Sequence, residues 1–202
     1  MRFLIIALVI AFTFTIGFIL GSNFASGKLN QIASSLKQSE LTAQSIFLEQ
    51  QLIAEVGCDK AKKRIEDLSL KLWDLGKLIG GEEAEKNLGK RNYLLLKKKF
   101  HLSQIETSLL YKNLIEECNL KDNVIIFYFS RNQSESAEQG KILDEFAKKG
   151  AKIFAIEFNF TPELNFFERF FDVKTTPAII INFNKKFEGL TKYEEIEKEI
   201  IT

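Results

Sequence analysis

Residues 171–181 read Phe-Asp-Val-Lys-Thr-Thr-Pro-Ala-Ile-Ile-Ile, and the arrangement of the C-terminal part of the chain can be worked out from them. The uncharged, isoleucine-rich run after Pro177 is typical of a central strand that is buried on both faces. We therefore expect a strand over Ala178–Phe183. The alternative is an ordinary trans proline that begins an edge strand, where its missing amide hydrogen does no harm.

Two further strands are expected before this one. Asn123–Ser130 is rich in β-branched and aromatic residues and has no charge between Val124 and Phe129, which indicates a buried central strand. Ala151–Phe158 alternates in part and predicts a second strand. Apolar residues at helical spacing predict a helix over residues 136–149 between them, and a parallel pair needs such a crossover.

The remaining elements follow from turn and capping signals. A helical turn is expected from Pro162, and Asn184–Lys186 predicts a tight turn into a short strand near Phe187–Glu188. Thr191–Glu194 resembles a capping box that opens a last helix. The predicted order is β-α-β-α-β-β-α, an α/β fold over residues 121–202.

In this order of elements the chain resembles the thioredoxin superfamily. Phe171–Ile181 is similar to the segment that leads into the family's cis-proline and third core strand. Val124–Ser130 is similar to the strand before the family's active-site helix, and Gly140–Phe146 is similar to that helix. The resemblance covers residues 122–202 and implies a C-terminal thioredoxin-like domain.

The resemblance also implies a contact surface. It implies that the Thr176–Pro177 bond is cis, which an X–Pro bond allows at a cost of about 0.5–1 kcal/mol. The Thr176 backbone would then lie beside the start of the active-site helix, where the family docks extended substrate segments. The implied binding residues are Thr175, Thr176 and Pro177.

The chemistry of the family needs Cys-x-x-Cys at the start of that helix, because the helix end favours the attacking thiolate. The corresponding positions here are Gln133, Ser134, Glu135 and Ser136, so we expect no catalytic residue and no cofactor at this site. Ser136 also begins a Ser-Ala-Glu-Gln capping box, which is a simpler role than that of a catalytic serine. The resemblance therefore implies that this chain has the fold of the family but not its redox activity.

The two cysteines of the chain lie elsewhere. Cys58 and Cys118 are 60 residues apart in the sequence. A structural disulfide between them would stabilise the fold by roughly 4 kcal/mol in the chain-entropy model. Two free buried thiols and a redox-active pair are the alternatives.

The middle of the chain is predicted to be helical. Apolar spacing predicts helices over Lys60–Ile79, Glu82–Phe100 and Ser103–Cys118. Asp59 is the expected N-cap of the first, and a capping box is expected at Ser103. His101, the only histidine of the chain, would then lie between two helices in a linking or packing role. No metal site is expected, because no Cys or carboxylate stands at ligand spacing from this histidine.

The N-terminal part differs sharply in character. Residues 3–20 carry no charge and would span about 27 Å as a helix, close to the hydrocarbon thickness of a bilayer. We expect a single-pass signal anchor of the cytoplasmic membrane, with the C-terminal domain outside; a cleaved signal peptide is the alternative. The predicted organisation is an anchor at 1–22, a helical stalk at 23–56, a helical module at 57–120 and the thioredoxin-like domain at 121–202.

Charge limits the classes of partner. The net charge is +1, so there is no basic excess to bind nucleic acid. The basic clusters Lys60–Arg64 and Lys97–Lys99 are interpreted as solvated helix faces, with contacts to anionic headgroups or a protein as the alternative.

Three functions remain. The first is an extracytoplasmic binding, scaffold or chaperone-like module without a redox motif, with protein partners. The second is a thiol-disulfide oxidoreductase relative that uses Cys58 and Cys118 or a partner's cysteines. The third is a structural protein that self-associates through its helical region.

Overall fold

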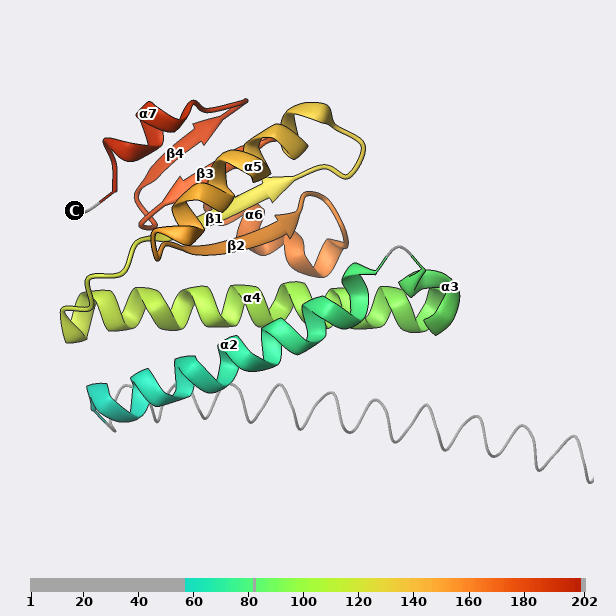
Figure 1. Cartoon of the computed structure of the whole chain (residues 1–202), viewed down its shortest axis with the longest axis horizontal. Helices are drawn as coiled ribbons and strands as arrows, with labels where there is room; N and C mark the ends of the chain where they lie inside the picture. The colour runs from blue at the N-terminus through green and yellow to red at the C-terminus, as the bar shows by residue number, and fades with distance from the viewer. Residues whose placement is uncertain (1–56, 82, 201–202) are drawn as a thin grey trace, which may run out of the picture. The chain divides into compact units, whose positions relative to one another are not determined.

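The computed structural model describes residues 57–81 and 83–200 (Figure 1). The predicted anchor and stalk lie outside these residues. Within the described ranges, no helix has the length and apolar character that a membrane crossing requires. The helices are α2 (Cys58–Gly80), α3 (Ala84–Leu88), α4 (Lys90–Cys118), α5 (Ser134–Lys148), the 3-10 turn η1 (Pro162–Leu164), α6 (Asn165–Phe170) and α7 (Tyr193–Glu197). The strands are β1 (Val124–Phe129), β2 (Lys152–Glu157), β3 (Ala178–Ile181) and β4 (Lys185–Glu188).

The four strands form one mixed sheet in the order β2-β1-β3-β4. β1 and β2 are parallel and are joined through α5, whereas β1 pairs antiparallel with β3 and β3 pairs antiparallel with β4. The prediction of an α/β fold with this order of elements is confirmed. β3 lies inside the sheet, so the alternative of an edge strand after Pro177 is wrong.

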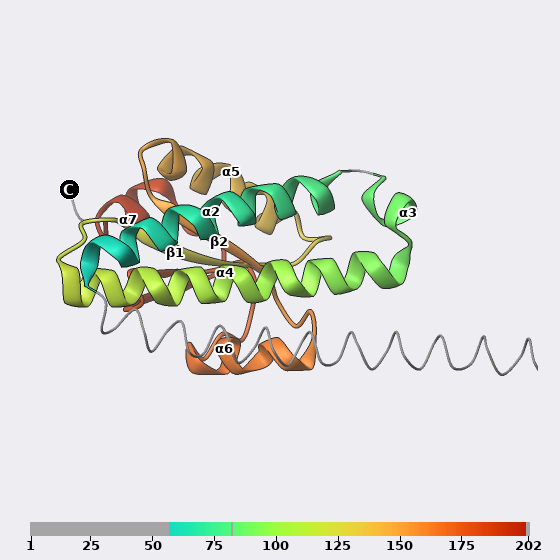
Figure 2. The same ribbon diagram turned by 90° about the horizontal axis from the view of Figure 1, so that it is seen from below.

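Helices cover both faces of the sheet, because alternate residues of its central strands point to opposite sides. Ile126 and Tyr128 of β1 pack with residues of α4, η1 and α6, whereas Ile125 and Phe127 pack with residues of α5 and α7. Figures 1 and 2 show α5 and α6 on opposite sides of the strands. The central strands β1 and β3 are therefore buried on both faces, as their uncharged sequences predict.

Two helices do lie within residues 82–118, but they are divided unequally into the short α3 and the long α4. The break falls earlier, at Gly89, whose φ of 75° suits glycine and separates α3 from α4. His101 and Ser103 therefore lie inside α4, so the predicted linker and the capping box at Ser103 are wrong. His101, Gln104 and Ile105 are all buried, and this packing holds the helix continuous through polar residues.

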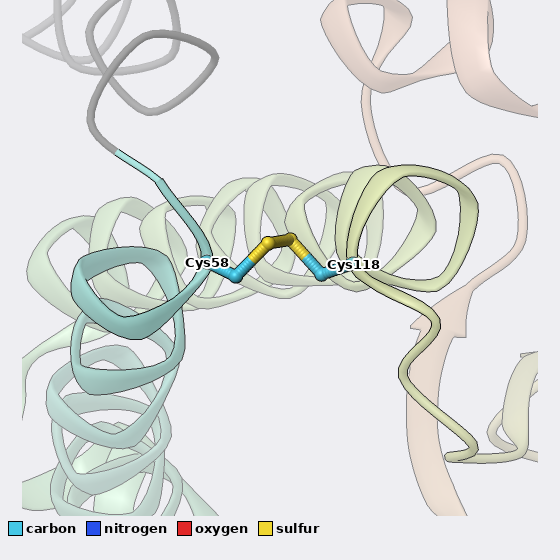
Figure 3. Close-up of a disulfide and its surroundings, with 2 residues drawn as sticks. All are labelled: Cys58 and Cys118. Carbon is cyan, nitrogen blue, oxygen red and sulfur yellow. A yellow bond between two sulfur atoms is a disulfide. The ribbon is translucent and has the colours of Figure 1, made fainter.

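The predicted disulfide is confirmed. Cys58 and Cys118 are bonded, and the bond joins the first residue of α2 to the last residue of α4 (Figure 3). α2 begins two residues earlier than expected, after Gly57, and Asp59 lies in its first turn instead of capping it. α2 packs along α4 with Ala61, Ile65 and Leu68 buried.

Candidate functional site

The cis-proline lies beside the start of α5. The Thr176–Pro177 bond is cis, as the resemblance implies. β3 begins one residue after Pro177, and its Ala178 pairs with Tyr128 near the end of β1. The antiparallel pairing therefore brings the segment that enters β3 next to the segment that leaves β1 and opens α5. Thr175 is exposed, Thr176 is half-buried and Pro177 is buried.

The Gln133 side chain bonds to both the backbone and the side chain of Thr176. Its Nε2 donates to the Thr176 carbonyl oxygen at 2.5 Å. Its Oε1 accepts from the Thr176 hydroxyl at 2.8 Å and from the Ser136 hydroxyl at 2.7 Å. The amide of Ser130 donates to Ser136 Oγ at 3.1 Å, and the hydroxyls of Ser130 and Thr176 lie 2.8 Å apart. We call Ser130, Gln133, Ser136 and Thr176 the polar network.

The polar network occupies the two positions that the resemblance assigns to thiols, Gln133 and Ser136. Ser136 does not cap α5: the N-cap residue is Gln133, and the helix begins at Ser134. Ser134 and Glu135 are exposed and take no part in the network. The Ser136 hydroxyl donates to an amide oxygen, so no base activates it as a nucleophile.

The disulfide lies at the other end of β1. Cys118 precedes this strand and the α5 start follows it, so the six residues of β1 separate them by about 20 Å. Figure 1 shows the same separation, with the end of α4 and the start of α5 at opposite ends of β1. The two cysteines therefore do not substitute for the missing thiols beside Pro177.

A partly buried ion-pair cluster, which has no signature in the sequence, lies where β1 and β2 end. Lys97 of α4 pairs with Glu157, and Arg131 Nε lies 3.1 Å from the same carboxylate oxygen. Arg131 Nη2 also donates to the Tyr93 hydroxyl at 2.6 Å. Burial, and next the charge of Arg131, lower the pKa of Lys97 to about 8. Lys97 is 5% exposed, so the interpretation of this part of the Lys97–Lys99 cluster as a solvated face is wrong.

His101 lies one helical turn from Lys97 and is 2% exposed. Its ring meets the Phe160 ring edge-on at 5.3 Å. The Ala155 carbonyl lies near the ring, but neither nitrogen makes a well-aligned hydrogen bond with a described residue. Burial, followed by the charges of Lys97 and Arg131, lowers the pKa of His101 to about 4. The ring is therefore neutral and packs, as expected, although within a helix.

Metal binding finds no support in the described ranges, where no group of three His, Cys, Asp or Glu side chains is placed to hold an ion. At the cis-proline site the side chains of the polar network are joined to one another by hydrogen bonds. Its exposed portion is the surface around Thr175 and the first turn of α5.

Comparisons with known proteins match neither a family model nor a curated protein. Among solved structures, a malarial protein is 19% identical with a TM-score of 0.32, covering 40% of this chain and 99% of that one. A chloroplastic thioredoxin z is 15% identical with a TM-score of 0.35, covering 45% of this chain and 82% of that one. The four-stranded mixed sheet, entered through a cis-proline, fits a thioredoxin-like fold.

Proposed function

We propose that the chain is a thioredoxin-like binding module, held by residues 3–20 in the cytoplasmic membrane with its C-terminal domain outside. It binds protein partners at the Thr176 end of the domain and carries out no thiol-disulfide exchange there. The uncharged N-terminal run supports the anchor. A disulfide suits an oxidising compartment and so supports the outward-facing topology.

The polar network carries this proposal. Where exchange chemistry needs a thiolate, the chain has an amide that hydrogen-bonds to the Thr176 carbonyl, and a hydroxyl that bonds to the amide. Neither group is a nucleophile for a disulfide. A module of this kind contacts its partners through exposed residues beside the network, of which Thr175 is one.

Insulin reduction tests the absence of exchange chemistry. The full chain should not accelerate insulin reduction by dithiothreitol, whereas Gln133→Cys combined with Ser136→Cys should do so, because it restores two thiols beside the cis-proline. Activity of the unaltered chain that disappears in Cys58→Ser would instead establish the oxidoreductase alternative.

Crosslinking in native membranes tests the contact surface. A photoreactive residue in place of exposed Thr175 should capture partner proteins. The matched control places it at Lys148, which is also exposed but lies at the far end of α5. Equal capture at both positions would refute a surface specific to the Thr176 end. Adducts composed of the chain itself would instead favour self-association.

The anchor requires a separate measurement. The chain should stay in the membrane pellet after alkaline carbonate extraction, and a version lacking residues 3–20 should be released. Protease that reaches only the outer face of the intact cytoplasmic membrane should degrade the C-terminal domain. Protection from that protease would overturn the proposed topology.

A further inference from the structure

A wide groove runs between the C-terminal half of α2 and the β2 side of the sheet. Its volume is about 1130 Å³, and its lining comes from α2 from Ser69 to Gly80, from Gly81, from one side of α4, from the start of β2 and from Phe129 and Arg131. No residue of the polar network lines it. This groove is therefore a second surface, distinct from the Thr176 end.

The lining of the groove is aromatic and apolar at its centre. Phe100 and Phe129 line it, together with Leu72 and Ile153 on opposite sides. Trp73, the only tryptophan of the chain, also lines it and is 63% exposed. Aromatic side chains in a concave surface supply much of the energy of protein recognition, because they bury large areas with few rotatable bonds.

The charge of the groove has one sign. Its lining contains Lys77, Lys97, Arg131 and Lys152 and, among the described residues, no carboxylate. Glu157 is not part of this lining and pairs with two of these cations, Lys97 and Arg131. Lys77 lies on α2, with its ammonium 4.7 Å from the centroid of the Trp73 ring, and Lys152 lies on β2. The α2 side and the β2 side of the groove therefore each carry one cation that does not belong to the ion-pair cluster.

We propose that this groove binds an acidic peptide segment of a partner protein, one in which carboxylate side chains alternate with leucine or phenylalanine. The apolar side chains of the segment pack against Trp73 and Phe129, and its carboxylates meet Lys77 and Lys152. Complementary charge sets the specificity of such a contact and speeds the encounter. A neutral peptide of the same shape lacks those ion pairs, and a basic peptide is repelled.

Trp73 makes the proposal measurable, because its fluorescence comes from within the groove. The full chain in phosphatidylcholine nanodiscs is titrated with a short blocked peptide in which Glu alternates with Leu and Phe. The same peptide with Gln for every Glu is the matched ligand control. We expect saturable change in the Trp73 emission with the Glu peptide, weakened by added salt, and at least about fivefold weaker binding of the Gln peptide.

The protein control compares two double variants with the same loss of charge. Lys77→Gln with Lys152→Gln should weaken binding of the Glu peptide about fivefold. Lys62→Gln with Lys63→Gln, exposed on α2 and outside the groove lining, should leave it unchanged. Equal binding of the two peptides, or equal effects of the two variants, would overturn the proposal. Binding of dodecanoate without binding of the Glu peptide would also overturn it, in favour of an anionic amphiphile.

Discussion

Acidification should destabilise the fold through His101. The pKa of this residue is lowered from an ordinary 6.5 to about 4 in the folded state, because the 2%-exposed ring disfavours its charged form. Between pH 6.5 and 4 the unfolded chain therefore binds a proton that the folded chain does not. The associated stability is fully present above pH 6.5 and is lost progressively as pH falls to 4. The difference in pKa corresponds to at most about 3 kcal/mol.

The assay uses the fact that the chain has one histidine. Urea unfolding is followed between pH 7.5 and 4 for the unaltered chain and for His101→Leu, which keeps an apolar side chain at this position. Carboxylates contribute to both curves, so the difference between the curves isolates the histidine. We expect the unaltered chain to lose roughly 2–3 kcal/mol more than the variant over this range.

The imidazole resonance provides an independent check, since NMR of a chain with one histidine has a single such signal in the folded state. Its chemical shift should titrate with a midpoint near pH 4. A midpoint near 6.5 in the folded protein would refute the reasoning, as would parallel stability curves for the two proteins. Either result would mean that water or a hydrogen-bond partner reaches the ring.

One treatment and two substitutions test the packing, each through the free energy of unfolding measured with a chemical denaturant. Reduction of Cys58–Cys118, which opens a loop of 60 residues, should lower the free energy of unfolding by up to about 4 kcal/mol; unfolding curves unaffected by reductant would contradict this. Gln139→Leu removes the Oε1 acceptor, 2.7 Å from the buried Thr191 amide, and should cost about 1–3 kcal/mol, with an unchanged midpoint as the contrary result. Ile126→Ala, at a fully buried central-strand position, should cost about 2–5 kcal/mol, and a loss below 1 kcal/mol would mean that the core refills the space.

The two central strands of the sheet could be predicted from the sequence because they are buried on both faces. Val124–Phe129 and Ala178–Ile181 are short, uncharged runs rich in β-branched and aromatic residues. A strand with no solvent-facing side has such a continuous apolar sequence. The cis form of the Thr176–Pro177 bond was implied by the resemblance to the thioredoxin superfamily. The disulfide could be proposed because the chain has one pair of cysteines.

The helical part was harder to predict because polar residues are buried there. Lys97, His101 and Gln104 lie on the buried side of α4 and give the sequence no clear apolar stripe. Their burial depends on Glu157, which lies 60 residues after Lys97, and on the rings around His101. The sequence pattern around Lys97 does not indicate an ion-pair partner that lies 60 residues away. The Gln133 bonds were missed for the same reason, since Thr176 lies 43 residues away.

The position of the disulfide also has a mechanical consequence for the helix pair. The bond fixes α2 to α4 at the Cys58 end, whereas the Gly80 end continues only into the short α3 (Figure 2). A tilt of α2 away from α4 must therefore pivot at the sulfur atoms. α2 has 23 residues and is about 35 Å long, so a tilt of roughly 10° displaces its far end by about 6 Å. The disulfide would therefore confine such a tilt to the Gly80 end of α2, and Trp73, which lies nearer to that end than to Cys58, would move with it.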